Sequence, residues 1–110
     1  MKTFYHVTKL ENYNNIMNIG LIPQVGELSS DCDEDVPRVY LFPTLDDMEN
    51  ALGNWLGEWY EENYGEDIKL CSLKISLPDT FPISYNDEVP YECYSYDVIE
   101  SKYIEFLKEE

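Results

Sequence analysis

The sequence predicts an α+β domain with a mainly antiparallel sheet and two helices in its N-terminal half. Strand and helix patterns alternate through the first half of the chain, and strand patterns alone fill the second half. Helices separated in this way from a run of strands are typical of α+β folds. The chain has 110 residues, of which 44% are hydrophobic, so we expect a single domain over 1–110.

The first strand is expected at 3–8, where β-branched and aromatic residues are concentrated. Thr8 is the expected N-cap of a helix, with Glu11 three residues later as its capping-box partner. That helix is expected to stop at Gly20, because glycine readily adopts the conformation that ends a helix. A polar connection follows at 24–37, and connections of this length often carry function.

A second strand and a second helix are expected between residues 38 and 65. The apolar run at 38–42 is typical of a buried strand. Thr44 is the expected N-cap of the helix, and two aspartates in its first turn suit the helix dipole. Apolar residues at helical spacing predict one continuous helix to Gly65, only modestly weakened by Gly53 and Gly57.

The second half of the chain predicts strands alone. Apolar residues alternate over 68–77, with a slip of phase near Cys71 that indicates a β-bulge. A short extended piece is expected at 81–85 and an aromatic strand at 91–96. For 103–107 both a strand and a short helix fit, and we favour the strand.

The charge balance limits the partners of the protein. Seven lysines and arginines stand against 23 acidic residues, giving a formal net charge of −16. A chain with this balance is not expected to bind nucleic acid directly, because that needs a basic face, nor an anionic membrane. A basic protein partner and mimicry of a polyanion stay open.

The expected location is the cytoplasm. The N-terminal residues lack the apolar core and cleavage site of a signal peptide, and no apolar run reaches the ~18 residues of a membrane span. The three cysteines, Cys32, Cys71 and Cys93, are widely spaced, which fits neither a disulfide framework nor a zinc site. We therefore expect reduced thiols and no bound metal.

Three residues are candidates for chemistry: His6, Tyr40 and Glu92. Each also has a structural explanation. The sole histidine is as easily a hydrogen-bonded strand residue, and Tyr40 a core aromatic whose hydroxyl finds a partner. Glu92 begins an aromatic strand, where a carboxylate is costly unless it is paired or lies at a sheet edge.

Taken in order, these residues resemble the His-Tyr-Glu signature of the ADP-ribosyltransferase superfamily. The sequence YHVT at 5–8 with GLIP at 20–23 is similar to the opening of its small branch, which includes RNA 2′-phosphotransferase-like and DNA-modifying enzymes. The run VYLF at 39–42 resembles the strand that presents the tyrosine. Residues 91–99 and 102–104 resemble the ending found in poly-ADP-ribose polymerases, where a glutamate begins a strand.

The resemblance implies a split, mainly antiparallel sheet of ADP-ribosyltransferase type that holds NAD in a cleft. In this family pattern His6 hydrogen-bonds a ribose hydroxyl, backbone at Val7 and Thr8 holds the nicotinamide amide, and Tyr40 stacks on the nicotinamide ring. Glu92 is the implied catalytic residue, accepting from the ribose 2′-hydroxyl and stabilising positive charge as the glycosidic bond breaks.

The pyrophosphate of NAD usually contacts cations, and Lys9, Arg38 or the start of the first helix are the candidates here. Arg38 is the sole arginine, which argues against 2′-phosphotransfer itself because that reaction needs several arginines around the phosphate.

Three functions are consistent with the sequence. The first is an NAD-dependent ADP-ribosyltransferase, or an NAD glycohydrolase, whose unidentified acceptor is expected to be a basic protein. The second is a catalytically inert acidic protein of the same fold that blocks a basic nucleic-acid-binding surface on a partner. The third is an α+β domain in which the three residues occur by chance.

Overall fold

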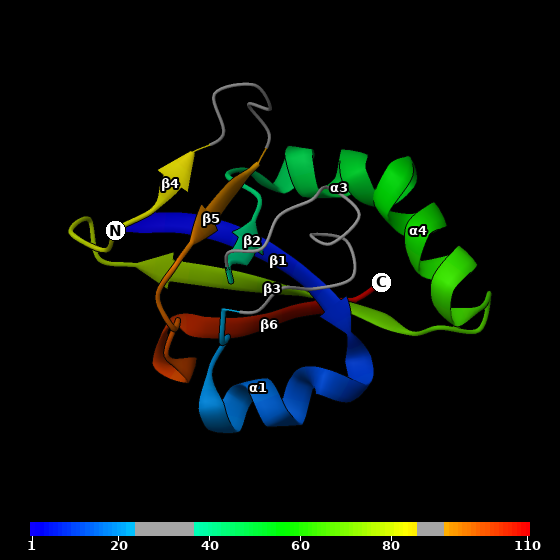
Figure 1. The fold of residues 1–110 in the computed structure, drawn as a ribbon, viewed down its shortest axis with the longest axis horizontal. Coiled ribbons are helices and arrows are strands. Elements are labelled where there is room, and N and C mark those ends of the chain that lie inside the picture. Colours follow the sequence, from blue (N-terminus) through cyan, green and yellow to red (C-terminus); the bar gives the residue numbers. More distant parts are fainter. Residues whose placement is uncertain (24–36, 86–91) are drawn as a thin grey trace.

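The computed structural model describes residues 1–23, 37–85 and 92–110, which form two antiparallel sheets and three α-helices (Figure 1). The strands are β1 (Lys2–Lys9), β2 (Val39–Leu41), β3 (Leu70–Leu77), β4 (Ser84–Tyr85), β5 (Cys93–Ser95) and β6 (Ile104–Glu109). The helices are α1 (Tyr13–Ile19), α3 (Leu45–Gly53) and α4 (Trp55–Tyr64), with 3-10 turns η1 (Leu10–Asn12) and η2 (Ser101–Tyr103). The α+β class predicted from the sequence is confirmed.

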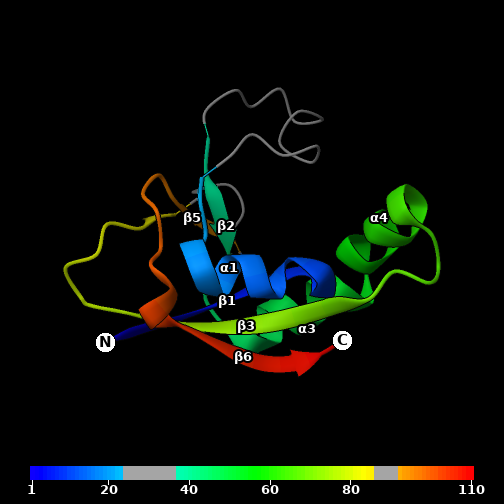
Figure 2. The same ribbon diagram turned by 90° about the horizontal axis from the view of Figure 1, so that it is seen from below.

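The larger sheet has the strand order β1-β3-β6 and the smaller one the order β2-β5-β4. A bridge between Tyr5 and Phe42 joins them, with each backbone N–H donating to the other residue's carbonyl at 2.9 and 2.8 Å. Beyond this bridge the strands diverge, and β2 runs steeply across β1 and β3 (Figures 1 and 2). The junction is therefore a point at which two sheets meet edge to edge and separate.

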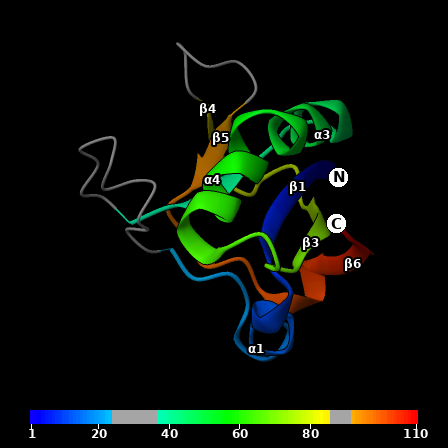
Figure 3. The ribbon, with the colours of Figure 1, turned by 90° about the vertical axis from the view of Figure 1, so that its right-hand side faces the viewer.

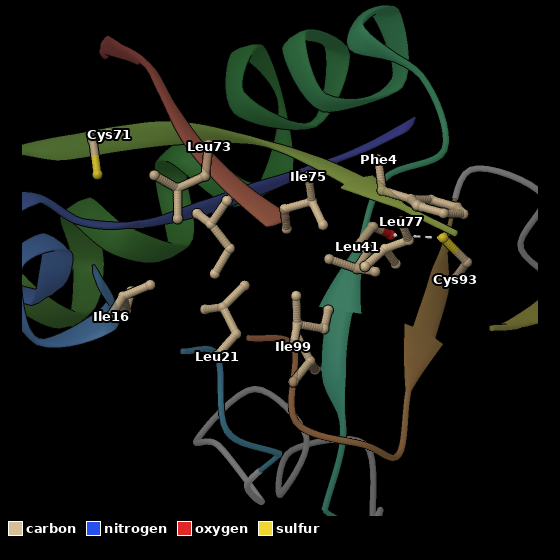
Figure 4. Packing of buried hydrophobic residues seen from close by; sticks show 12 residues of the cluster. Phe4, Ile16, Leu21, Leu41, Cys71, Leu73, Ile75, Leu77, Cys93 and Ile99 are labelled. Atoms are coloured by element: carbon tan, nitrogen blue, oxygen red, sulfur yellow. Dashed lines mark hydrogen bonds between the residues drawn. The ribbon is translucent and has the colours of Figure 1, made fainter. Parts of the chain in front are cut away.

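Two hydrophobic clusters cover the two faces of the larger sheet. The first lies between this sheet, the smaller sheet and α1, and the residues drawn in Figure 4 come from all three. The second lies under α3 and α4 and includes Val7, Phe42 and Met48. Figure 3 shows α1 and the α3–α4 pair on opposite sides of the larger sheet. Side chains alternate along β1, so neighbouring residues contribute to different clusters.

Several local predictions are confirmed. Gly20 ends α1 with a φ of 83°, and a Cβ there would collide with the Ile99 carbonyl oxygen. The Thr44 hydroxyl caps α3 by accepting from the Asp47 N–H at 3.0 Å. The register between β3 and β6 shifts between Ser72 and Leu73, close to the predicted bulge. The strand favoured at 103–107 is β6, and the predicted connection 24–37 lies outside the described residues except for its last member.

The predicted capping box at Thr8 is wrong. Strand β1 continues to Lys9, and a 3-10 turn precedes α1, whose N-cap is Asn12 without a side-chain cap bond. The Thr8 hydroxyl instead accepts a hydrogen bond from the Asn12 side chain at 3.4 Å. Pairing with β3 through Lys9 and Leu70 holds this part of the chain extended, so tertiary pairing overrides the local capping signal.

The single helix predicted between Thr44 and Gly65 is also wrong. It is broken at Asn54, whose backbone leaves the helical region (φ −121°, ψ −95°), so α3 and α4 are separate helices. The described residues accordingly hold three α-helices rather than the two predicted. Gly57 fits this break, because a Cβ at that position would collide with the Leu52 carbonyl oxygen.

Candidate active site

His6 lies at the junction where the two sheets separate. Its Nδ1 is 2.7 Å from the carbonyl oxygen of Tyr40. Tyr40 pairs with Tyr94 across β2 and β5, while its own backbone groups point to the opposite edge of β2, toward β1. The imidazole therefore bonds a carbonyl that the diverging strand β1 does not reach.

This contact determines the protonation of His6. A carbonyl only accepts hydrogen bonds, so Nδ1 carries the hydrogen. Burial lowers the pKa of His6 below its usual value of 6.5, and the hydrogen bond to Tyr40 offsets part of that effect. At neutral pH the ring is uncharged, and its Nε2 is an acceptor suited to a hydroxyl group.

The smaller sheet presents a polar and aromatic face. Val39 and Leu41 on β2, with Cys93 and Ser95 on β5, are buried, and the residues between them are not. Alternation therefore directs Tyr40 and its cross-strand partner Tyr94 away from the first cluster. Their ring centroids are 6.2 Å apart, in an edge-on arrangement.

Arg38 belongs to the same face. Its guanidinium carbon lies 4.3 Å from the centre of the Tyr94 ring and 5.5 Å from that of Tyr96. A guanidinium stacked on aromatic rings is held in a fixed orientation. The sequence did not single out Tyr94, although its spacing of two residues from Tyr96, which is typical of one face of a strand, was the available signal.

Glu92 immediately precedes β5 and is partly buried. The next residue, Cys93, pairs with Leu41, so Glu92 lies near the end of β2 that bridges to β1. Because neighbouring strands are about 4.8 Å apart, the backbones of Glu92 and Tyr5 are on the order of 10 Å apart across β2. Glu92 thus lies at the entry to β5, which pairs with the strand of Tyr40 and is separated from β1 by that strand.

Cys93 is not a nucleophile in this arrangement. Its thiol is fully buried and lies 3.5 Å from the Leu41 carbonyl oxygen (Figure 4). Burial, followed by the negative charges of Glu92 and Asp47, raises the pKa of Cys93 to about 12. The thiol is therefore protonated at neutral pH, and thiolate chemistry is absent there.

Val7 and Thr8 are both buried and follow His6 on β1. The backbone N–H and C=O of Val7 point to the same edge of β1 as those of Tyr5, away from β3, because alternate residues share a direction. This edge is the one from which β2 diverges. The backbone of Thr8 points the other way, into the ladder with β3, and its hydroxyl bonds Asn12.

Lys9 is turned away from the junction. Its ammonium pairs with Glu11 at 3.3 Å and lies 4.3 Å from the centre of the Tyr64 ring. Arg38 is thus nearer than Lys9 to the tyrosine face among the predicted cationic residues. The structure brings His6 against the Tyr40 carbonyl and the Tyr40 ring against the Tyr94 ring. Glu92 lies just before β5, and Lys9 lies apart from these residues.

Two surface hollows are lined by described residues, and neither contains His6, Tyr40 or Glu92. One, of about 480 Å³, lies between η1 and the start of β3, and the other, of about 220 Å³, lies where α3 meets α4. Among residues 1–23, 37–85 and 92–110, no three metal-binding side chains form a cluster, and no helix is long and apolar enough to cross a membrane.

The chain was compared with protein-family models, curated proteins and solved structures. No family model matches it, and neither does any curated protein or solved structure. A proposal on function consequently has to rest on the side chains and backbone groups at the junction of the two sheets.

Proposed function

We propose that the protein is an NAD-dependent ADP-ribosyltransferase, or an NAD glycohydrolase, that cleaves the bond between nicotinamide and ribose. The observation that carries the proposal is the 2.7 Å contact of His6 with Tyr40 at the point where β1 and β2 separate. The contact leaves His6 as a neutral imidazole whose Nε2 can accept a hydrogen bond. Glu92 lies just before β5, the strand that pairs with the strand of Tyr40. The split-sheet type of fold is part of this proposal.

The strand geometry supports a binding mode for nicotinamide riboside. The backbone N–H and C=O of Val7 suit the carboxamide, which needs one acceptor and one donor. The Tyr40 ring suits stacking on nicotinamide, and Nε2 of His6 suits a ribose hydroxyl. Arg38, on the same face as Tyr40, is the better candidate for the pyrophosphate, since a planar guanidinium binds phosphate oxygens in pairs.

The chemistry then needs one well-placed anion. The C1′–N bond breaks, its electron pair leaves with neutral nicotinamide, and positive charge develops on the ribose ring. The Glu92 carboxylate stabilises that charge more in the transition state than in the ground state. Attack by the acceptor forms the new bond at C1′, and the acceptor's proton passes to solvent. Attack by water gives free ADP-ribose instead.

Replacing Glu92 by glutamine tests this role. Glutamine keeps the shape and hydrogen-bonding capacity of the side chain but removes the charge, so NAD cleavage is expected to fall by about 100-fold or more. Nicotinamide release from NAD, followed by chromatography, measures the rate. Calorimetric titration of NAD onto the variant is expected to give a Kd within a few-fold of the unmodified protein.

Glu105→Gln is the matched control, because Glu105 is an exposed glutamate on β6, at the far edge of the larger sheet from β1. Its cleavage rate and melting temperature are expected to remain unchanged. Equal rates for Glu92→Gln and the unmodified protein would contradict the proposal, as would an absence of NAD binding in both.

The acidic binding protein remains a second candidate, favoured by the net charge of −16 and by the hollow between α3 and α4, which contains none of the three signature residues. It predicts no heat of binding with NAD and salt-sensitive association with a basic partner. The same titration therefore distinguishes the two candidates.

A further inference from the structure

One surface of the molecule combines carboxylates, amides and an exposed tryptophan. It comprises outward side chains of α3 from its first turn onward, the break at Asn54 and α4 as far as Glu62. We refer to it as the α3–α4 face, and its members are Asp47, Asn50, Asn54, Trp55, Glu58 and Glu62. The hollow of about 220 Å³ lies within it, and its lining residues come from both helices.

The charge of this region has one sign. Residues 39–68 contain eight aspartates and glutamates and no lysine or arginine. Glu58 and Glu62 are one helical turn apart and both exposed, so their charges face the same side of α4. Lys108 does approach α3, but its partner there is Glu49, at 3.8 Å. The face therefore attracts cations and repels other acidic surfaces.

Trp55 gives the face an apolar anchor. It is 38% exposed although it sits in the helical periodicity that the sequence assigns to a core, and it is the first residue of α4 after the break at Asn54. It adjoins Asn54, whose side chain donates to the Asn50 carbonyl at 2.6 Å and is thereby fixed. Exposed tryptophans beside a hollow are typical energetic centres of protein interfaces.

The face also lies close to Glu92. The chain runs into α3 from β2, the strand that pairs with β5 (Figure 1). Consistent with this, the charges of both Glu92 and Asp47 act on the Cys93 thiol. A chain segment lying across the face near Asp47 can thus extend toward the proposed catalytic carboxylate of Glu92.

We propose that the α3–α4 face docks a lysine- and arginine-rich polypeptide segment, with its cationic side chains against Glu58 and Glu62 and its aliphatic stems on Trp55. The proposal deepens the proposed function, because the docked polypeptide would be the acceptor of ADP-ribose. Docking itself requires no NAD, so binding and turnover can fail separately.

A synthetic peptide of repeated Lys-Arg-Gly units is a suitable probe, with a Gln-Gln-Gly peptide of equal length as its reference. Both tryptophans of the chain, Trp55 and Trp59, belong to α4, so intrinsic fluorescence reports on the helix that carries Trp55, Glu58 and Glu62. The titrations are made at about 0.15 M salt, where the Debye length is ~8 Å. The Lys-Arg-Gly peptide is expected to quench the tryptophan fluorescence saturably, and the Gln-Gln-Gly peptide is not.

Matched double variants distinguish the effect of the α3–α4 face on peptide binding from the effect of the net charge. Glu58→Gln with Glu62→Gln removes two charges from the face, and Glu105→Gln with Glu109→Gln removes two exposed charges from β6. The first pair is expected to weaken peptide binding about 5- to 10-fold, and the second by less than twofold. Trp55→Ala, measured by calorimetry, is expected to weaken binding at least 5-fold.

Equal weakening by both double variants would overturn the proposal, since only the net charge would then matter. Absence of saturable binding to the unmodified protein would overturn it as well. Selective weakening without any NAD cleavage would support docking on this face and reject the proposed enzyme.

Discussion

At the scale of single residues, the most informative group is His6. Its imidazole bonds the Tyr40 carbonyl across 34 positions of sequence, so the contact has both a structural and a chemical explanation. The structural one is satisfaction of a carbonyl at the edge of β2. The chemical one concerns Nε2, the ring nitrogen that this bond does not use. Substitutions that keep a nitrogen near the place of either Nδ1 or Nε2, but not both, distinguish the structural from the chemical explanation.

Asparagine at position 6 carries its amide nitrogen near the place of Nδ1, whereas glutamine reaches toward Nε2. His6→Asn is expected to keep the free energy of unfolding within about 0.5 kcal/mol, and His6→Gln to lose about 1–2 kcal/mol through the unsatisfied carbonyl. Urea denaturation measures both. If His6 also binds ribose, NAD cleavage is expected to fall in both variants, including the stable one. Full activity of His6→Asn would assign the histidine to structure alone.

The lowered pKa of His6 makes stability depend on pH. Because the folded pKa lies below 6.5, the unfolded chain binds more protons in the range just under pH 6.5. The stabilisation is therefore complete above pH 6.5 and is lost as the pH falls below it, at no more than about 1.4 kcal/mol per pH unit. Between pH 7.5 and 5.5 the unmodified protein is expected to lose more stability than His6→Asn. Parallel pH profiles for the two would be inconsistent with the buried neutral ring.

At the scale of elements, the break between α3 and α4 depends on a close approach at Gly57. A Cβ there meets the Leu52 carbonyl, which is rigid backbone, whereas a Cβ at Gly53 meets nothing within 4 Å. Gly57→Ala is expected to destabilise the fold by about 1–3 kcal/mol. Gly53→Ala is expected to be neutral or to stabilise by up to about 1 kcal/mol, because alanine favours helix. Chemical denaturation gives both values, and a shift of the same sign in the two variants would be evidence against this explanation of the break.

The elements also show how far local sequence patterns reach. The strand at 38–42, the cap at Thr44 and the stop at Gly20 were predictable because each depends on neighbours along the chain. The break at Asn54 was not, because apolar spacing continues through it from Met48 to Trp59. The capping box at Thr8 failed for a related reason, since pairing with β3 keeps the chain extended.

The candidate site was predictable only in part. The residue types and their order indicated His6, Tyr40 and Glu92, but the contact between His6 and a backbone carbonyl depends on how two sheets diverge. The position of Lys9 beside Glu11 and Tyr64 likewise follows from the turn η1, which the helix prediction omitted. The contact of His6 and the position of Lys9 both depend on tertiary geometry, which local sequence patterns do not encode.

At the scale of the whole molecule, the net charge of −16 opposes compaction. The ion pairs seen among the described residues span 3.2 to 3.8 Å and lie mostly on the surface, where such pairs contribute little. Raising the ionic strength from about 0.01 to 0.15 M shortens the Debye length from ~30 to ~8 Å. The melting temperature is therefore expected to rise in calorimetry, equally with sodium and choline chloride. A fall, or a rise with sodium alone, would contradict a general screening effect.

The bridge between Tyr5 and Phe42 has a consequence for how the protein can vary. Its two hydrogen bonds fix the register of β1 against β2. A shift of β1 by one position would turn each of its side chains to the opposite face of the sheet. Such a slip would present Tyr5 or Val7 to the Tyr40 carbonyl in place of the sole histidine. Inserting or deleting one residue within β1 would thus leave a strand able to form but would remove the contact between His6 and the Tyr40 carbonyl. The C-terminal end of β6, where Lys108 and Glu109 are exposed, is expected to accept changes of length more readily.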